Sequence, residues 1–245
     1  MSIISDLNNN SLREVVQFNL ISKFPTSAKL NLLCNERISC QENFMFIHIP
    51  KTGGTSINKA LEKHAIAAQK KYYRTQFIKH AKAKDIKKIL GDKVYAKYFS
   101  FAFVRNPWDL MVSSYHWWRQ KAEAVNRVSG LYRGFGEPDI NKIKSMSFDD
   151  FITSKYGRGY INEHKGEIFD WISEDGEIII DYVGKLETLQ EDWQYICSKT
   201  GLPFINLSHS NYTKREHYRT YYSEHTRELV AARFRRTIEQ FEYEF

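Results

Sequence analysis

The feature that most constrains this chain is an apolar run that stops at a turn rich in glycine and hydroxyl groups. Residues 44–49 read FMFIHI, which is typical of a short buried strand, and PKTGGTS begins with the next residue. From residue 56 to 64 the apolar positions recur at helical spacing. Because a helix begins with unpaired backbone N–H groups and a partial positive charge, this strand–turn–helix unit predicts a binding site for an anion.

The residues of this turn suit a phosphate-like ligand because they supply a mobile positive charge, glycines that let a ligand approach the backbone, and hydroxyl donors. We expect all of them at the site: Lys51, Thr52, Gly53, Gly54, Thr55 and Ser56. Their order differs from the phosphate loop of nucleotide triphosphatases, G-x-x-x-x-G-K-[ST], since here the lysine precedes the glycines. No strand ends in an aspartate placed to hold magnesium, and Asp181 is the nearest approach. We therefore expect binding without a dedicated metal.

A second unit of the same kind follows about fifty residues later. Residues 98–104 (YFSFAFV) form an aromatic, apolar run that ends at Arg105. Asn106 is a favourable N-cap, and Pro107 is a favourable first residue of a helix. The residues that follow carry apolar side chains at helical spacing. The sequence therefore predicts a second strand that turns directly into a helix.

A third strand is predicted over residues 177–183 (EIIIDYV), before a helix at about 189–199, and the final segment 223–245 reads as one helix. Strands that alternate with helices predict an α/β fold in which a central parallel sheet is flanked by helices on both faces. Residues 1–42 are polar and mixed and read as an N-terminal extension, which leaves 43–245 as one domain.

Composition narrows the class of protein. Apolar residues make up 42% of the 245, and the formal net charge is +7, which suits an anionic ligand. Much of the basic charge lies in residues 70–88, which read as the solvated face of a helix. Three cysteines without a pattern argue against disulfides and zinc. We find no candidate membrane span and no signal peptide, so we expect a soluble, cytoplasmic protein.

Together the two turns resemble a known family. PKTGGTS, followed by FAFVRNPWDLMVSSYHW, is similar to the sulfotransferases that use 3′-phosphoadenosine 5′-phosphosulfate (PAPS). The resemblance is strongest to the carbohydrate O-sulfotransferases of the heparan-2-sulfate and chondroitin type and their bacterial relatives, and it extends over residues 44–245. It implies a P-loop-like sulfotransferase fold and transfer of a sulfuryl group to a hydroxyl or amine, with release of adenosine 3′,5′-bisphosphate (PAP).

The resemblance also implies roles for individual residues. The segment 51–56 matches the 5′-phosphosulfate loop, in which Lys51 would stabilise the transition state. Arg105 and Ser113 match the 3′-phosphate motif, and the family's spacing selects Ser113 over its neighbour Ser114. Two helical turns separate such residues by roughly 11 Å, a gap that an arginine side chain largely spans. Lys214 and Arg215 lie where a second clamp on the 3′-phosphate is expected.

An acceptor hydroxyl needs a base, and the resemblance favours His80 among the eight histidines. The lysines around His80 would keep its imidazole neutral at physiological pH. His48 reads as structural because it lies at the end of a strand, and His116 reads as a packing residue that could still face an acceptor. Glu187 is a less favoured alternative base.

The acceptor is expected to be a carbohydrate or a small molecule, held by residues 122–165 with Trp117, Tyr132 and Phe135 as candidate lining. Two other readings stay open. A P-loop nucleotide kinase would share the strand–turn–helix cradle, and a non-catalytic nucleic-acid-binding module would use the basic surface and aromatic side chains. No nucleic-acid motif occurs, so we do not expect nucleic acid as a partner. The sequence does not indicate an oligomeric state.

Overall fold

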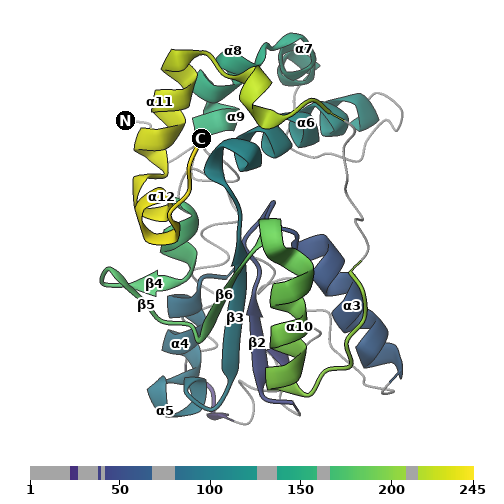
Figure 1. Ribbon diagram of the computed structural model, residues 1–245, viewed down its shortest axis with the longest axis vertical. Coiled ribbons are helices and arrows are strands. Elements are labelled where there is room, and N and C mark those ends of the chain that lie inside the picture. Colours follow the sequence, from purple (N-terminus) through teal and green to yellow (C-terminus); the bar gives the residue numbers. More distant parts are fainter. Residues whose placement is uncertain are drawn as a thin grey trace.

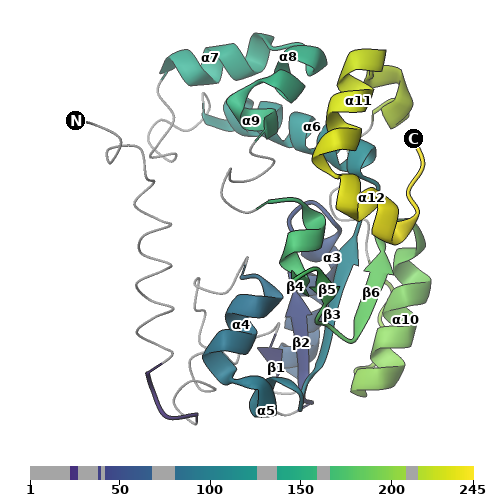
Figure 2. The same ribbon diagram turned by 90° about the vertical axis from the view of Figure 1, so that its left-hand side faces the viewer.

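The main sheet is mixed, with a parallel centre. A computed structural model of the chain describes residues 23–26, 38–39, 42–67, 81–125, 137–158, 166–207 and 215–245. Its four-stranded sheet has the order β1–β2–β3–β6, with strands Ile38–Ser39, Phe44–Ile47, Phe99–Val104 and Tyr182–Lys185 (Figure 1; β1 is labelled in Figure 2). Strand β1 is antiparallel to β2, whereas β2, β3 and β6 run parallel. The α/β class and the parallel sheet are confirmed. Strand β1 was not predicted, and it lies in the segment read as an extension.

Helices cover both faces of the sheet, as predicted, because successive strand residues point to opposite sides. Phe46 of β2 and Phe101 of β3 stack on one face, with ring centroids 5.2 Å apart. That face packs against α3 (Gly54–Ala67) and α10 (Leu189–Thr200). The opposite face, which includes Ile47 and Ala102, packs against α4, α5 and η2, whose bounds are Ala83–Leu90, Asp92–Tyr95 and Ile168–Trp171.

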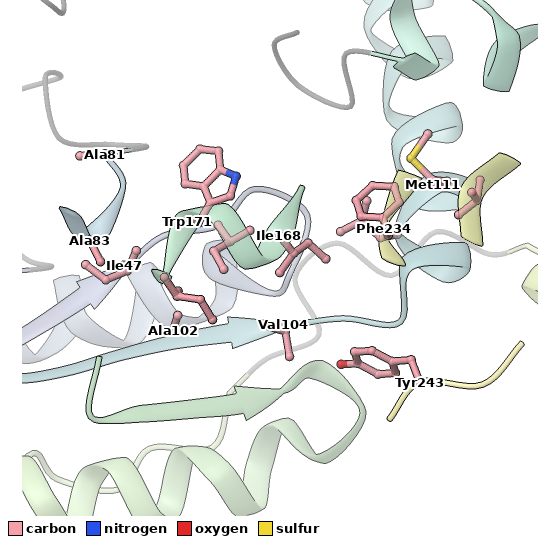
Figure 3. Close-up of a cluster of buried hydrophobic side chains, with 14 of the residues drawn as sticks. Ile47, Ala81, Ala83, Ala102, Val104, Met111, Ile168, Trp171, Phe234 and Tyr243 are labelled. Carbon is pink, nitrogen blue, oxygen red and sulfur yellow. The ribbon is translucent and has the colours of Figure 1, made fainter. Parts of the chain in front are cut away.

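A group of helices lies beyond the carboxyl ends of the parallel strands (Figures 1 and 2). Its members are α6 (Pro107–Val125), α7 (Glu137–Ser145), α8 (Phe148–Thr153), α9 (Lys155–Arg158), η4 (Tyr218–Tyr221), α11 (Glu224–Arg233) and α12 (Arg235–Phe241). Figure 3 shows that one buried cluster continues from Val104 of β3, through Ile168 and Trp171, to Met111 of α6 and Phe234. Packing of this continuous core therefore fixes the helices relative to the strand ends.

Helix α6 begins as the sequence predicts. The side-chain oxygen of Asn106 accepts hydrogen bonds from the backbone N–H of Trp108 at 3.0 Å and of Asp109 at 3.4 Å. Pro107 is the first helical residue, where its missing N–H costs nothing. The amide of Asn106 also donates to the carbonyl of Glu244 at 2.8 Å, so the C-terminal segment holds this turn from outside.

Two predicted elements are wrong in detail. The run 177–183 is not one strand: β5 (Glu177–Ile178) forms a hairpin with β4 (Ser173–Glu174), and only β6 joins the main sheet, continuing into η3 (Leu186–Thr188). The carboxylate of Asp181 accepts from the backbone N–H and the hydroxyl of Ser100, which holds the chain where it changes sheets. The final segment is two helices, α11 and α12, which meet at Phe234 rather than forming one helix.

Candidate active site

The two predicted anion-binding turns touch each other. Strands β2 and β3 are parallel neighbours, so the turns that follow Ile47 and Val104 lie at the same edge of the sheet. Nη1 of Arg105 donates to the backbone carbonyl of Lys51 at 3.0 Å. One turn therefore holds the other in place, and the residues predicted for the two ends of a ligand share one site.

The backbone of the first turn adopts left-handed conformations at two positions. Gly53 has φ +91°, which suits glycine, but Lys51 has φ +66°, which is unfavourable for a side chain with a Cβ. The hydroxyl of Thr52 is fully buried and donates to the carbonyl of Ile49 at 2.8 Å. The sequence predicts a donor to the ligand at Thr52, and in the structure its hydroxyl instead bonds across the turn to Ile49, which leaves the backbone N–H of Thr52 as its group for the ligand.

The N-terminus of α3 is open to an anion. Its first turn carries no acidic residue, so the positive end of the helix is not neutralised locally. The side chain of Thr55 is exposed there, whereas Ser56 is buried. Gly53 and the start of α3 therefore present backbone N–H groups and one accessible hydroxyl beside Lys51.

Gly54 is required for a reason that the sequence does not show. A Cβ at this position would lie 2.1 Å from the ring of His48, which is buried and stacks on Phe46 with centroids 5.5 Å apart. His48 is thus a packing residue beneath the turn, in agreement with its structural interpretation.

Replacing Gly54 with alanine is expected to destabilise the protein. The added methyl group cannot fit unless His48 or the turn moves, and overpacking of this kind costs about 1–3 kcal/mol of unfolding free energy. Chemical denaturation of Gly54→Ala measures this, with the same substitution in a His48→Ala background as the control, because the ring that the new methyl group would meet is absent there. An unchanged denaturation midpoint in Gly54→Ala would show that the His48 contact is not rigid.

Lys51 lies among other cations. Burial, and next the positive charges of Arg105, Arg215 and Lys121, lower the pKa of its ammonium to about 8. Its Nζ also lies 5.6 Å from the ring centroid of Trp117, an exposed side chain of α6. A buried lysine among other cations is a position where a bound anion would stabilise the charged form of the lysine.

Asp109, which the sequence analysis did not single out, joins the two arginines. Its Oδ2 accepts from Nε and Nη2 of Arg105 at 2.8 and 2.6 Å, and its Oδ1 accepts from Nη2 of Arg215. Nη1 of Arg215 is buried and has no hydrogen-bond partner in the described part of the chain. The available signal was the spacing of Arg105 and Asp109, which lie four residues apart across the start of a predicted helix.

Ser113 and Ser114 differ in their availability. The hydroxyl of Ser114 is buried and donates to the carbonyl of Leu110 at 3.0 Å within α6. Ser113 is half-buried, and among the described residues its side chain makes no hydrogen bond. The geometry therefore favours Ser113 as the serine available to a ligand. The spacing of the 3′-phosphate motif, in which a serine follows the arginine by eight residues, selects the same serine.

His116 lies one helical turn after Ser113 on α6. Its Nε2 is 3.0 Å from the hydroxyl of Tyr221, and burial together with Arg215 and Arg119 lowers the pKa of the imidazole. Glu187 is committed elsewhere, because its two oxygens accept from the backbone N–H of Asn106 at 2.7 Å and the hydroxyl of Tyr243 at 3.2 Å. Four predicted site residues lie outside the described residues: His80, Tyr132, Phe135 and Lys214.

The fold and these contacts define an α/β protein with a cluster of cationic side chains at the carboxyl edge of its sheet. The sulfotransferase family model matches residues 36–244, and the chain belongs to that family. It is similar to carbohydrate sulfotransferase 14 of Danio rerio, at 22% identity across 93% of this chain. That match covers 64% of the fish protein, so the chain spans just under two thirds of its length.

A second relative is an uncharacterized protein of Archaeoglobus fulgidus, 25% identical over 120 residues, which make up 48% of this chain and 80% of that protein. No solved structure matches. Within the described ranges, none of the helices combines the length and the apolar character needed to span a bilayer.

Proposed function

We propose that this protein transfers a sulfuryl group from PAPS to a hydroxyl or amine of a carbohydrate or small-molecule acceptor by in-line displacement, leaving PAP. Family membership supports the reaction class, and the Danio rerio relative supports a carbohydrate acceptor. The observation that carries the proposal is the hydrogen bond from Arg105 to the carbonyl of Lys51, because it joins a site for a 3′-phosphate to a site for a 5′-phosphosulfate.

The residues present suit such a nucleotide. Arg215 keeps a buried donor group without a partner in the described chain, and Ser113 offers a hydroxyl on the same helix as Asp109. Burial, and next the neighbouring cations, lower the pKa of Lys51, so an anionic group beside its ammonium would stabilise the charged form. Arg105, Ser113 and Arg215 would hold the 3′-phosphate with Lys214, and residues 51–56 would hold the 5′-phosphosulfate.

In the reaction, PAPS supplies the sulfuryl group and its phosphate end leaves with additional negative charge. The ammonium of Lys51 and the backbone N–H groups at the start of α3 would stabilise that charge as it develops. Interactions that strengthen as the bond breaks raise turnover rather than affinity alone. Arg105, by holding the carbonyl of Lys51, would keep this lysine in its left-handed conformation during the step.

We propose His80 as the base that takes the proton of the acceptor. His80→Ala should lower turnover by about 100- to 10,000-fold, as the loss of a general base does. His116→Ala should lower it much less, because the imidazole of His116 is hydrogen-bonded to Tyr221. Turnover of both variants with a fixed acceptor distinguishes them, and a large loss confined to His116→Ala would move the base to α6.

Trp117 is the proposed platform for the acceptor. Its side chain is 38% exposed, and it lies next to Lys51 and the proposed transfer site. An exposed aromatic side chain suits contact with the apolar face of a sugar ring, and the ammonium groups of Lys51 and Lys121, each 5.6 Å from its ring centroid, add positive charge beside it.

The pH dependence should report Lys51. Since the pKa of Lys51 is about 8 in the free protein, its positive charge is lost as the pH rises through that value. We therefore expect kcat/KM for PAPS to fall above about pH 8, because kcat/KM follows the free enzyme. In Lys51→Arg this alkaline decline should be absent up to about pH 10, since arginine stays charged. An identical decline in both proteins would assign it to another group.

The proposal is tested by nucleotide binding and by transfer. Calorimetry in EDTA should show PAP binding, and labelled sulfuryl transfer from PAPS should be seen with members of a panel of oligosaccharides, alcohols and amines. The kinase alternative predicts instead a strict requirement for ATP and magnesium. Asp181 does not favour that alternative, because its carboxylate is bound to Ser100 at the far end of β3 from the turn. Steeply salt-dependent binding of arbitrary oligonucleotides would favour the nucleic-acid alternative.

A further inference from the structure

Asp109 occupies the centre of the cationic site. It belongs to the first turn of α6, and its two oxygens are divided between two arginines that lie far apart in the sequence. The side chains of Arg105 and Arg215 are only 12% and 13% exposed. A carboxylate shared by two largely enclosed guanidinium groups fixes the position of both.

The donors left over indicate what this arrangement receives. Arg105 uses Nε and Nη2 on Asp109 and Nη1 on the carbonyl of Lys51. Arg215 uses Nη2 on Asp109, whereas its Nη1 is buried and without a partner in the described chain. A guanidinium that is already aligned and keeps a free pair of N–H donors is suited to a phosphate oxygen.

Charge explains why a carboxylate belongs in a site for an anion. The ammonium of Lys51 lies close enough to Arg105, Arg215 and Lys121 to be affected by all three, so one carboxylate among these four cations leaves a formal charge of +3. A phosphate monoester carries about −1.5 to −2 at neutral pH, so the site keeps enough positive charge to bind one such group even with Asp109 present. Without Asp109 the two arginines would repel each other and separate.

We propose that Asp109 is a positioning residue that aligns Arg105 and Arg215 for a 3′-phosphate, so that it determines the preference for a 3′,5′-bisphosphate over a nucleotide that lacks the 3′ group. The proposal rests on the proposed function. Asp109 itself does not touch the ligand. It acts through the two arginines, and its effect is therefore confined to the part of the nucleotide that they bind.

The test compares two nucleotides on one variant. Calorimetry measures the Kd of PAP and of adenosine 5′-phosphate for the wild-type protein and for Asp109→Asn, which keeps the shape of the side chain and removes its charge. We expect Asp109→Asn to raise the Kd of PAP about tenfold or more, as loss of one partner of an enclosed charge pair does. The Kd of adenosine 5′-phosphate should change less than about threefold. Asp175→Asn, the same change at an exposed turn, should alter neither Kd.

Each other outcome decides against the proposal. An equal rise in the Kd of both nucleotides would mean that Asp109 only supports the fold. An unchanged or lower Kd of PAP would mean that the carboxylate competes with the phosphate. If Asp109→Asn does not fold, Asp109→Glu is the second variant, because it keeps the charge but displaces it by one methylene. A ratio of the two Kd values equal to that of the wild type in Asp109→Glu would then overturn the inference. A wild-type protein that does not prefer PAP would overturn the proposed function as well.

Discussion

Replacing Lys51 with alanine is expected to lower turnover with PAPS by about 100- to 1000-fold, which is the loss seen when one preorganised transition-state donor is removed. The substitution deletes the ammonium beside the start of α3 but keeps a Cβ at φ +66°, so the backbone strain of the turn is unchanged. Single-turnover rates at saturating PAPS isolate this effect from nucleotide affinity.

Two comparisons make this result specific to Lys51. Lys97→Ala removes the same charge at an exposed position before β3 and should leave turnover unchanged. Thermal unfolding of Lys51→Ala should show no loss of stability, since Lys51 makes no side-chain hydrogen bond among the described residues and its charge is disfavoured by burial and by the neighbouring cations. Near-normal turnover in Lys51→Ala would mean that the charge of this lysine does not act on the leaving group.

Replacing Arg105 with alanine should impair both affinity and turnover. The guanidinium is expected to contact the 3′-phosphate, and truncation of an enclosed charge partner weakens binding by about 30-fold or more. The same substitution removes the hydrogen bond that holds the carbonyl of Lys51, so turnover at saturating PAPS should fall as well. PAP calorimetry and single-turnover kinetics measure the two effects separately.

The serines of α6 provide the contrast to Arg105. Ser113→Ala should lower the affinity for PAP without changing turnover, because Ser113 makes no hydrogen bond to Lys51 in the described structure. Ser114→Ala should leave PAP affinity unchanged, because the Ser114 hydroxyl bonds to Leu110. If Arg105→Ala changed only the affinity for PAP, the contact between the two turns would have no role in the reaction.

Local signals explain what could be predicted from the sequence. The apolar runs that end at PKTGGTS and at Arg105 specify strands followed by helices, and the Asn106–Pro107 pair specifies where α6 begins. These features depend on residues that are neighbours along the chain, so the types of those residues are enough to predict them. The placement of both turns at one edge also follows, because parallel strands bring their carboxyl ends together.

Contacts between distant segments explain what could not be predicted. Nothing in the sequence shows that His48 fills the space of a Cβ at Gly54, or that Thr52 turns its hydroxyl inward. Apart from Glu177 and Asp181 the run 177–183 is apolar, so its pattern does not mark where the chain leaves one sheet for another. The meeting of Arg215 with Asp109 joins positions 106 residues apart, and only the folded chain reveals it.

The central claim is that the turns at Lys51 and Arg105 form one site for a single nucleotide. A crystal structure of the complex with PAP tests it most directly. We expect the 5′-phosphate to contact Lys51 and the first turn of α3. We expect the 3′-phosphate to contact Arg105, Ser113 and Arg215. A nucleotide bound elsewhere, or one that reaches only one of the two turns, would contradict it.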